Sequence, residues 1–220
     1  MENLLRLYIL RHGQTKNHNR NLFNGWTDVP LTVLGKRQLN AAVAALKGIP
    51  FTAIYSSDLS RAKYGGEVLA KQSSLPLEVS EQWREMNFGD CEGLTFKEIQ
   101  DKYPDLANQI MHPGSEGIHF PNGENDRDFK SRIAKALAHL CEKHQGGAVG
   151  LVSHSGVGRA ILAEFLDLNT RNMWTLTQSF AGLHVLDIFS DGSVVIKVLN
   201  AYLGPEGYHQ HGPGWDFLAK

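Results

Sequence analysis

The sequence predicts an α/β fold, a three-layer αβα sandwich in which helices cover both faces of a central, mostly parallel sheet. Short apolar segments typical of buried strands alternate with longer segments whose apolar residues recur at helical spacing. Several strand segments end in basic or small polar residues just where a helix is expected to begin. Because no internal repeat or linker-like stretch interrupts this alternation, we expect residues 1–220 to form a single domain.

The composition is that of an ordinary globular protein without a dominant charge. Of 220 residues, 42% are hydrophobic and 20% are charged, and the formal net charge is −1. No overall basic field attracts nucleic acid, so any anion site has to be local. The N-terminal residues resemble neither a signal peptide nor a membrane span. The two cysteines, Cys91 and Cys141, are expected to be thiols, which favours a cytoplasmic location.

The first strand is predicted over 4–10, a run that is apolar except for Arg6. A nearly continuous apolar run of this length is typical of a strand that is buried on both faces. The run stops at Arg11, His12 and Gly13. A cation and an imidazole are costly at the end of a buried strand unless they have a function. The alternative is a polar strand end whose side chains lie in water.

Two later strands end in the same way. The segment 53–56 runs into Ser-Asp-Leu-Ser-Arg-Ala at 57–62, and the segment 148–152 runs into Ser-His-Ser-Gly at 153–156. Ligands of open α/β sheets bind at the carboxyl ends of the strands, so these three ends are expected to form one pocket. The pocket would be positive and suited to phosphate, because guanidinium groups offer a fork of donors that matches phosphate oxygens. It would contain Arg11, His12, Arg61 and His154.

The other elements are predicted from periodicity and from capping residues. Thr32 and Thr95 are the expected N-caps of two helices. A loop or lid without clear periodicity is predicted over about 105–125, and such a loop is the expected place for substrate specificity. The tail from about 204 is expected to be irregular. The remaining predicted elements are a strand at 76–79, helices at 60–72, 126–144 and 157–166, and a hairpin of 183–188 with 194–199.

Taken together, these motifs resemble those of the histidine phosphatase superfamily, the phosphoglycerate-mutase-like family. The resemblance rests on Arg-His-Gly at 11–13, the segment 57–62, Glu85 and Ser-His-Ser-Gly at 153–156, which occur in the family's order. It extends from residue 5 to about residue 200 and implies the phosphoglycerate-mutase-like form of the αβα sandwich. It also implies phosphoryl transfer through a phosphohistidine, without a metal or another cofactor.

The chemistry of phosphoryl transfer agrees with the roles that the resemblance implies. The reaction needs an in-line nucleophile and positive charge around the phosphoryl oxygens. His12 would be the nucleophile, and its ring must then be neutral, a form that neighbouring arginines favour. The phosphate ligands would be Arg11, Arg61 and His154, and the starts of two helices would add backbone donors.

The resemblance assigns Glu85 as the group that protonates the leaving oxygen and later takes a proton from water. Carboxyl groups can perform both steps in one site. Three nearby carboxylates are the alternatives, although a solvated surface would also explain them. They are Glu81, Asp90 and Glu92.

The loop 21–28 resembles the corresponding loop of the mutase branch, so Asn24 and Gly25 are expected to donate hydrogen bonds to the phosphoryl group or substrate. A plain polar turn is the alternative. The chain also departs from the family. His18 stands where an asparagine is usual, and Phe96 stands where the mutases have a lysine. The paired arginines of a longer mutase insertion are not evident.

We therefore expect a phosphatase that hydrolyses phosphate monoesters of small metabolites through a phosphohistidine. The alternatives are a 2,3-bisphosphoglycerate-dependent phosphoglycerate mutase and a non-catalytic module that binds phosphorylated ligands. The Glu85 motif and the segment 121–124 resemble small-metabolite phosphatases, including α-ribazole phosphatase and fructose-2,6-bisphosphatase relatives.

The expected partner is a small phosphorylated metabolite rather than nucleic acid or a membrane, and a homodimer is left open. No metal-binding motif is present in the sequence. His209 and His211 lie two residues apart in the tail, where a chance or weak metal contact is the expected explanation.

Overall fold

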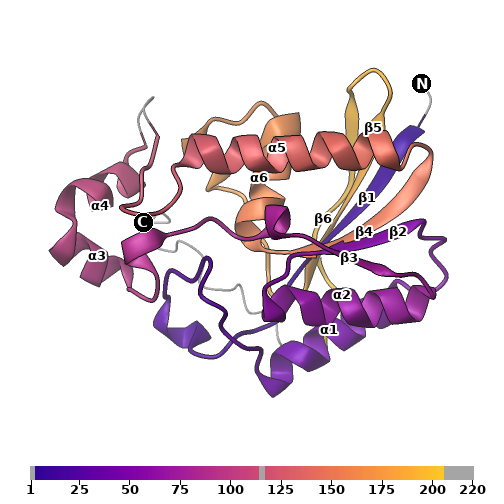
Figure 1. The fold of residues 1–220 in the computed structure, drawn as a ribbon, viewed down its shortest axis with the longest axis horizontal. Helices are drawn as coiled ribbons and strands as arrows, with labels where there is room; N and C mark the ends of the chain where they lie inside the picture. The colour runs from indigo at the N-terminus through magenta and orange to yellow at the C-terminus, as the bar shows by residue number, and fades with distance from the viewer. Residues whose placement is uncertain (1–2, 114–116, 206–220) are drawn as a thin grey trace.

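Strands from both halves of the chain form one sheet in the computed structural model, which describes residues 3–113 and 117–205. The sheet has six strands in the order β3-β2-β4-β1-β5-β6 (Figure 1). The strands are β1 (Asn3–Arg11), β2 (Ala53–Ser56), β3 (Leu77–Val79), β4 (Gly147–Ser153), β5 (Gly182–Phe189) and β6 (Val194–Tyr202).

The sheet is mostly parallel, as predicted. Strand β1 pairs in parallel with β4, β4 with β2, and β2 with β3, while β5 and β6 are antiparallel. The last two strands form the predicted hairpin. The central strand β1 is buried on both faces, because Leu7 and Ile9 belong to one core cluster and Tyr8 and Leu10 to the other.

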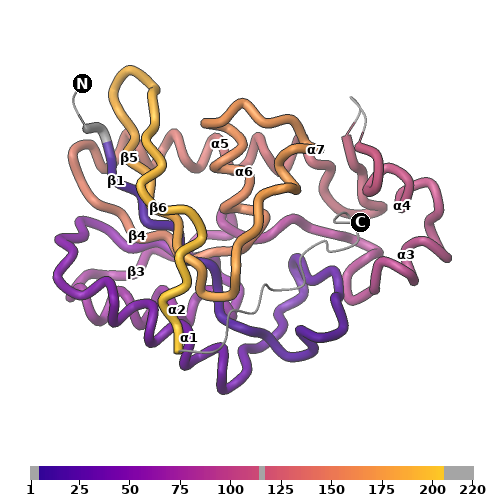
Figure 2. The backbone as a smooth tube through the Cα atoms, turned by 180° about the vertical axis from the view of Figure 1, so that it is seen from behind, coloured from indigo at the N-terminus to yellow at the C-terminus, as the bar shows by residue number. Residues whose placement is uncertain are grey.

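Helices cover both faces of the sheet, which confirms the three-layer prediction. Helices α1 (Val33–Ala45) and α2 (Ser60–Ser73) lie on one side, and α5 (Asp126–Lys143) and α6 (Ser155–Phe165) lie on the other (Figures 1 and 2). The shorter helices are α3 (Phe96–Lys102), α4 (Pro104–Met111) and α7 (Thr170–Met173), with 3₁₀ turns at His18–Arg20, Glu81–Trp83 and Gly89–Cys91.

Local sequence signals account for the helix starts. The Thr32 hydroxyl accepts the Gly35 N–H at 2.9 Å, and Thr95 forms a reciprocal capping box with Glu98. The glycine pair in α2 permits close packing. A Cβ atom on Gly66 would lie 2.7 Å from the Ser56 Cβ, which is too close for any other residue.

The loop predicted over about 105–125 is wrong in its first part, because α4 occupies 104–111. Pro104 ends α3 but also stands in the first turn of α4, where its missing N–H costs nothing. The helix has only eight residues, too few for a clear period in the sequence. In the described remainder, Ile118 and Phe120 are buried in the core.

No helix in residues 3–113 or 117–205 is long and apolar enough to cross a membrane. The expectations for the tail beyond residue 205, including His209 and His211, lie outside the described residues.

Candidate active site

The backbone register brings the predicted strand ends together. Arg11 lies opposite Ser153 in the β1–β4 pair, and the His12 N–H donates to the Ser153 carbonyl at 2.9 Å. His154 follows directly as the N-cap of α6. Arg61 lies in the first turn of α2, and its Nε donates to His154 Nδ1 at 3.3 Å. The structure therefore brings the four basic residues together, with Arg11, His12 and Arg61 lining a pocket and the fully buried His154 behind them, outside the lining.

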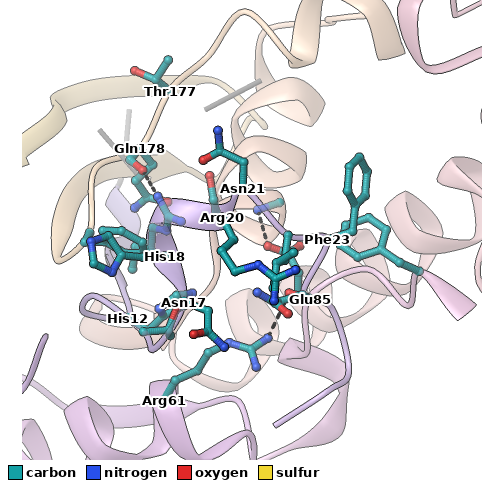
Figure 3. A pocket seen from close by; sticks show the side chains of 18 of the residues that line it. His12, Asn17, His18, Arg20, Asn21, Phe23, Arg61, Glu85, Thr177 and Gln178 are labelled. Carbon is teal, nitrogen blue, oxygen red and sulfur yellow. Dashed lines mark hydrogen bonds between the residues drawn. The ribbon is translucent and has the colours of Figure 1, made fainter. Parts of the chain in front are cut away.

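These strand ends open into a pocket of about 540 Å³. Its lining includes Arg11, His12, Arg61 and Glu85, together with residues from the segments 15–24 and 174–180. Figure 3 shows His12, Arg61 and Glu85 around one end of the pocket, with Asn21 and Thr177 toward the other. No residue of 104–113 or 117–125 lines it, so the described part of the expected specificity loop is not in contact with the pocket.

His12 has the electronic state that a nucleophile needs. Its Nδ1–H donates to the Gly13 carbonyl at 2.8 Å, which leaves the lone pair on Nε2. Burial lowers the pKa of His12 well below its usual value, and the charges of Arg11 and Arg61 lower it further. The ring is therefore neutral at physiological pH.

Two buried donors beside His12 have no hydrogen-bond partner in the described part of the chain. They are His154 Nε2 and Arg11 Nε. Because His154 Nδ1 accepts from Arg61, its proton belongs on Nε2. The centroids of the two histidine rings are 5.3 Å apart. Buried donors without partners are rare, and two of them beside one neutral imidazole suit the oxygens of an anion.

The side chains of Arg11 and Arg61 are held by uncharged groups. Arg11 donates to the Gln178 carbonyl, and its guanidinium stacks 4.3 Å from the centre of the Phe180 ring. Burial, with the nearby charge of Arg159, lowers the pKa of Arg11 to about 9. Arg61 is 1% exposed and donates to the carbonyls of Gly25 and Thr27. Neither forms an ion pair with a carboxylate among the described residues, which leaves their charge available to a bound anion.

Glu85 is held at the start of α6. Its carboxylate accepts the Gly156 N–H at 2.9 Å and the Met86 N–H at 3.0 Å. A Cβ atom on Gly156 would lie 2.0 Å from Glu85 Oε1, so only glycine allows this approach. Of the alternatives, Glu81 and Asp90 are exposed and do not line the pocket.

Glu92 and Gly25 depart from what the sequence predicted. The Gly25 N–H donates to Glu92 at 3.0 Å, so Gly25 is not a donor in the pocket, and it is absent from the lining. The solvated-surface interpretation of Glu92 is also wrong, because its carboxylate accepts the N–H groups of Trp26 and Thr27 as well. Glu92 thus holds the loop that supplies carbonyls to Arg61. Asn24 does line the pocket.

Sequence reasoning missed a clamp around Glu85. Arg132 of α5 donates to the carbonyls of Gln82 and Arg84 at 2.8 and 3.0 Å. It also reaches the Glu85 carbonyl at 3.3 Å and pairs with both carboxylate oxygens of Glu124 at 2.8 Å. The only signal was the resemblance of 121–124 to phosphatases, since a contact across 48 residues is not visible in a sequence.

A second missed residue, Arg159, lines the pocket from α6 and is 6% exposed. It stands four residues after Ser155, on the same face of the helix that begins at the site. This arginine among the buried apolar residues and glycines of 156–163 was a signal that could have identified it. His18, Asn17 and Arg20 also line the pocket.

Within residues 3–113 and 117–205, no group of three or more histidine, cysteine or acidic side chains is placed to hold a metal ion. Cys91 and Cys141 are free thiols.

The fold and the site define an α/β protein whose strand ends carry a buried histidine and arginine pocket suited to phosphate. More specifically, the chain belongs to the histidine phosphatase superfamily (branch 1), whose family model matches residues 7–201. The resemblance in the motifs is thereby confirmed.

The curated relatives include both phosphatases and mutases. The chain is 27% identical over 195 residues to the adenosylcobalamin/alpha-ribazole phosphatase of Escherichia coli, covering 83% of this chain and 96% of that protein. It is 31% identical over 197 residues to the 2,3-bisphosphoglycerate-dependent phosphoglycerate mutase of Bartonella henselae, covering 86% and 94%. It is 30% identical over 198 residues to a bifunctional protein of Mycobacterium tuberculosis. This match covers 89% of this chain but only 53% of that protein, so the chain spans about half of that relative's length.

Solved structures share the whole architecture. YhfR of Bacillus stearothermophilus superposes with a TM-score of 0.82 at 25% identity, covering 90% of this chain and 99% of that one. A mycobacterial glucosyl-3-phosphoglycerate phosphatase in complex with inorganic phosphate superposes with a TM-score of 0.78 at 30% identity, covering 90% and 98%.

Proposed function

We propose that this protein is a phosphatase that hydrolyses phosphate monoesters of small metabolites through a phosphohistidine on His12. In the first step, His12 Nε2 attacks phosphorus and forms an N–P bond as the P–O bond to the leaving group breaks. Glu85 gives its proton to the leaving oxygen. In the second step, water attacks phosphorus, Glu85 takes a proton from that water, and the N–P bond breaks to release inorganic phosphate.

The observation that carries this proposal is the state of His12. Its lone pair lies on Nε2, because Nδ1–H is donated to the Gly13 carbonyl at 2.8 Å. His154 Nε2 and Arg11 Nε are buried beside it without partners in the described chain. A phosphoryl group in front of Nε2 would receive these hydrogen bonds, and the arginine charges would stabilise its equatorial oxygens.

The position of Glu85 supports its role as acid and base. It lines the same pocket as His12, and backbone N–H groups hold both of its carboxylate oxygens. Fixed orientation is what a proton donor to one particular leaving oxygen requires. Since Glu92 and the exposed Glu81 and Asp90 are directed elsewhere, Glu85 is the carboxylate that lines the pocket in the described chain.

Two further facts support a small phosphorylated substrate. A pocket of about 540 Å³ has the size of a small-metabolite site. The similar mycobacterial glucosyl-3-phosphoglycerate phosphatase was solved with inorganic phosphate, which is the product of the proposed reaction.

A phosphoglycerate mutase is the second candidate, favoured by the 31% identity to the Bartonella henselae enzyme. Phe96 lines the pocket at the position where the mutases have a lysine, and an aromatic ring cannot pair with a substrate carboxylate. With 3-phosphoglycerate and a catalytic amount of 2,3-bisphosphoglycerate, we expect phosphate release and little 2-phosphoglycerate. Efficient interconversion of the two phosphoglycerates would instead establish the mutase.

Trapping the intermediate tests the mechanism. The enzyme is mixed with ³²P-labelled substrate, quenched rapidly without acid, and digested. We expect the label on the peptide that contains His12, and no label on that peptide in His12→Asn. A matched control, His144→Asn, removes a histidine outside the pocket and should keep the label. Label on a serine peptide, such as that of Ser57 or Ser155, would contradict the mechanism, and the absence of turnover would favour a binding module.

A further inference from the structure

Arg159 is a buried cation in the pocket that the proposed mechanism does not use. It lies on α6, is 6% exposed, and lines the pocket that contains His12. We propose that Arg159 binds a second anionic group of the substrate, a carboxylate or a second phosphate carried by the leaving group. This inference rests on the proposed function and names the class of substrate that the same site takes.

The hydrogen bonds of Arg159 leave most of its guanidinium free. Its Nε donates to the Leu176 carbonyl at 2.6 Å, and its guanidinium carbon lies 5.2 Å from the centre of the Trp174 ring. No other hydrogen bond and no ion pair of Arg159 occurs with any residue in 3–113 or 117–205. The two terminal nitrogens are thus without partners in the part of the chain that the structure describes, on a side chain whose Nε is held by a carbonyl.

An arginine that is almost fully buried normally has a carboxylate partner, because an unpaired buried charge is costly. Arg132, which is half-buried, has such a partner, since it pairs with both oxygens of Glu124. Arg159 lacks one, as do the two arginines assigned to the phosphate, Arg11 and Arg61, and its neighbours are a carbonyl, an aromatic ring and the pocket. Burial lowers the pKa of Arg159 to about 10, so the side chain is still charged at neutral pH.

Arg159 lies on the side of the pocket that is not formed by strand ends. Its Nε donates to the Leu176 carbonyl and its guanidinium lies over the Trp174 ring, and both partners belong to the segment between α7 and β5. Arg159 also lies one helical turn beyond Gly156, whose N–H binds the Glu85 carboxylate. Glu85 acts on the leaving oxygen in the proposed mechanism. An anion on Arg159 would therefore belong to the leaving group rather than to the transferred phosphoryl group.

The charges in the pocket agree with this assignment. Three arginines with less than a tenth of their surface exposed line it, and Glu85 is its one carboxylate among the described residues. In the first step Glu85 carries the proton that it will donate. A phosphate dianion then balances two of the three cations, Arg11, Arg61 and Arg159. A further negative charge on the substrate would balance the third.

The test compares substrates that differ in one charge. The first pair is 3-phosphoglycerate and glycerol 3-phosphate, and the second pair is glucose 1,6-bisphosphate and glucose 6-phosphate. We expect kcat/KM of the wild-type protein to be about 10- to 100-fold higher for the more negative member of at least one pair, as a hydrogen-bonded charge contact provides. The first pair reports on a carboxylate and the second on a phosphate.

Arg159→Met should remove this preference, mainly by lowering kcat/KM for the more negative substrate about 10- to 100-fold. Arg159→Lys should keep part of it, because the charge remains without the fork of donors. The matched control Arg171→Met removes an exposed arginine of α7 that does not line the pocket, and should preserve the preference. These measurements need only the purified protein.

Two results would overturn the inference. One is a wild-type protein that does not discriminate within either pair, a measurement that does not depend on how the variants fold. The other is an Arg159→Met protein that loses the same factor on both members of each pair, which would indicate a structural role. Turnover of p-nitrophenyl phosphate tests the proposed phosphatase activity separately from the role of Arg159, because this ester carries no anionic group besides its phosphate. The wild-type protein should hydrolyse it if His12 is the nucleophile, whether or not Arg159 selects substrates.

Discussion

The two ends of the pocket are built in different ways. At the proposed phosphate end, His12 and His154 directly follow strands β1 and β4, and Arg61 lies in the first turn of α2, which follows β2. Backbone hydrogen bonds between these strands set their spacing. On the proposed leaving-group side, Glu85 and the segment 174–180 lie outside strands, and side chains from distant helices hold them.

This difference teaches where catalysis and specificity reside in the fold. In the proposed mechanism, the rigid sheet edge supplies the chemistry that every phosphate ester needs, whereas the side-chain clamps on the other side would select and protonate one kind of leaving group. Variants at the phosphate end should therefore affect all substrates equally. Variants on the leaving-group side should distinguish substrates by their leaving group.

The largest effect is expected at His12. His12→Asn removes the nucleophile, so kcat for alkyl and aryl phosphates should fall together by about 10⁴-fold or more. Steady-state phosphate release on both substrates provides the measurement, and thermal unfolding checks that the variant folds. A variant that still hydrolyses an aryl phosphate at a substantial rate would break the proposed division between the two ends.

The second effect is expected at Glu85 and should depend on the substrate. General acid–base catalysis is typically worth about 10²–10⁴-fold, so turnover of an alkyl phosphate by Glu85→Gln should fall by that factor. An aryl phosphate has a good leaving group that needs little protonation, so its phosphohistidine should still form quickly. Water attack would then become limiting, and rapid mixing should show a burst of about one aryl alcohol per active site.

The control for this experiment is Glu81→Gln, which changes an exposed carboxylate outside the pocket and should behave like the wild type. Equal losses on both substrates without a burst would mean that Glu85 is not the acid. Because Glu92 is engaged by backbone N–H groups, Asp90 would be the next carboxylate to test.

The two ends of the pocket also differ in how well the sequence predicts them. The residues of the phosphate end adjoin apolar strands, so Arg11, His12, Arg61 and His154 could be placed together from pattern alone. The Thr32 and Thr95 caps were equally local and are confirmed. These predictions need only neighbouring residues and sheet topology, and the structure confirms them.

Predictions that depend on contacts between distant segments were wrong or missing. Glu92 was assigned to a solvated surface because its three loop N–H partners lie more than 60 residues away. The same limit hid Arg132. The Gly25 N–H was assigned to the pocket from the resemblance of its loop to the mutase loop, and its hydrogen bond to the distant Glu92 could not be seen in the sequence. Helix α4 was missed because Pro104 marks either the end or the start of a helix.

A smaller effect is expected from the clamp around Glu85. Arg132→Gln removes the donors to the carbonyls of 82, 84 and 85, so the Glu85 carboxylate should lose its fixed orientation. We expect about a 10-fold loss of kcat on alkyl phosphates and little change in the burst rate on aryl phosphates. Arg132→Lys should recover part of the loss.

The control is Arg6→Gln, which removes an ion pair with Asp187 outside the pocket and should leave the ratio of alkyl to aryl turnover unchanged. If Arg132→Gln lowers the melting temperature but leaves that ratio at the wild-type value, the clamp supports stability alone. A changed ratio identifies Arg132 as a positioning residue for the proton donor.

The smallest effect concerns stability rather than rate, and it arises from the titration of buried histidines. Burial lowers the pKa values of His12 and His154 well below the ordinary value near 6.5, and burial beside Arg159 lowers that of His184 to about 4. Below about pH 6.5 the unfolded chain binds protons that the folded protein excludes, so the free energy of unfolding falls as the pH falls. Each histidine contributes at most about 1.4 kcal/mol per pH unit, and the contribution of His184 ends near its folded pKa of about 4.

Urea unfolding at pH 7.5, 6.5, 5.5 and 5.0 measures the slope of the free energy of unfolding against pH, which should be shallower in His154→Gln than in the wild type. An equal slope in the two proteins would show that His154 is not buried in the neutral form, and a free energy of unfolding that stays constant between pH 6.5 and 5.0 would show the same for His12, His154 and His184.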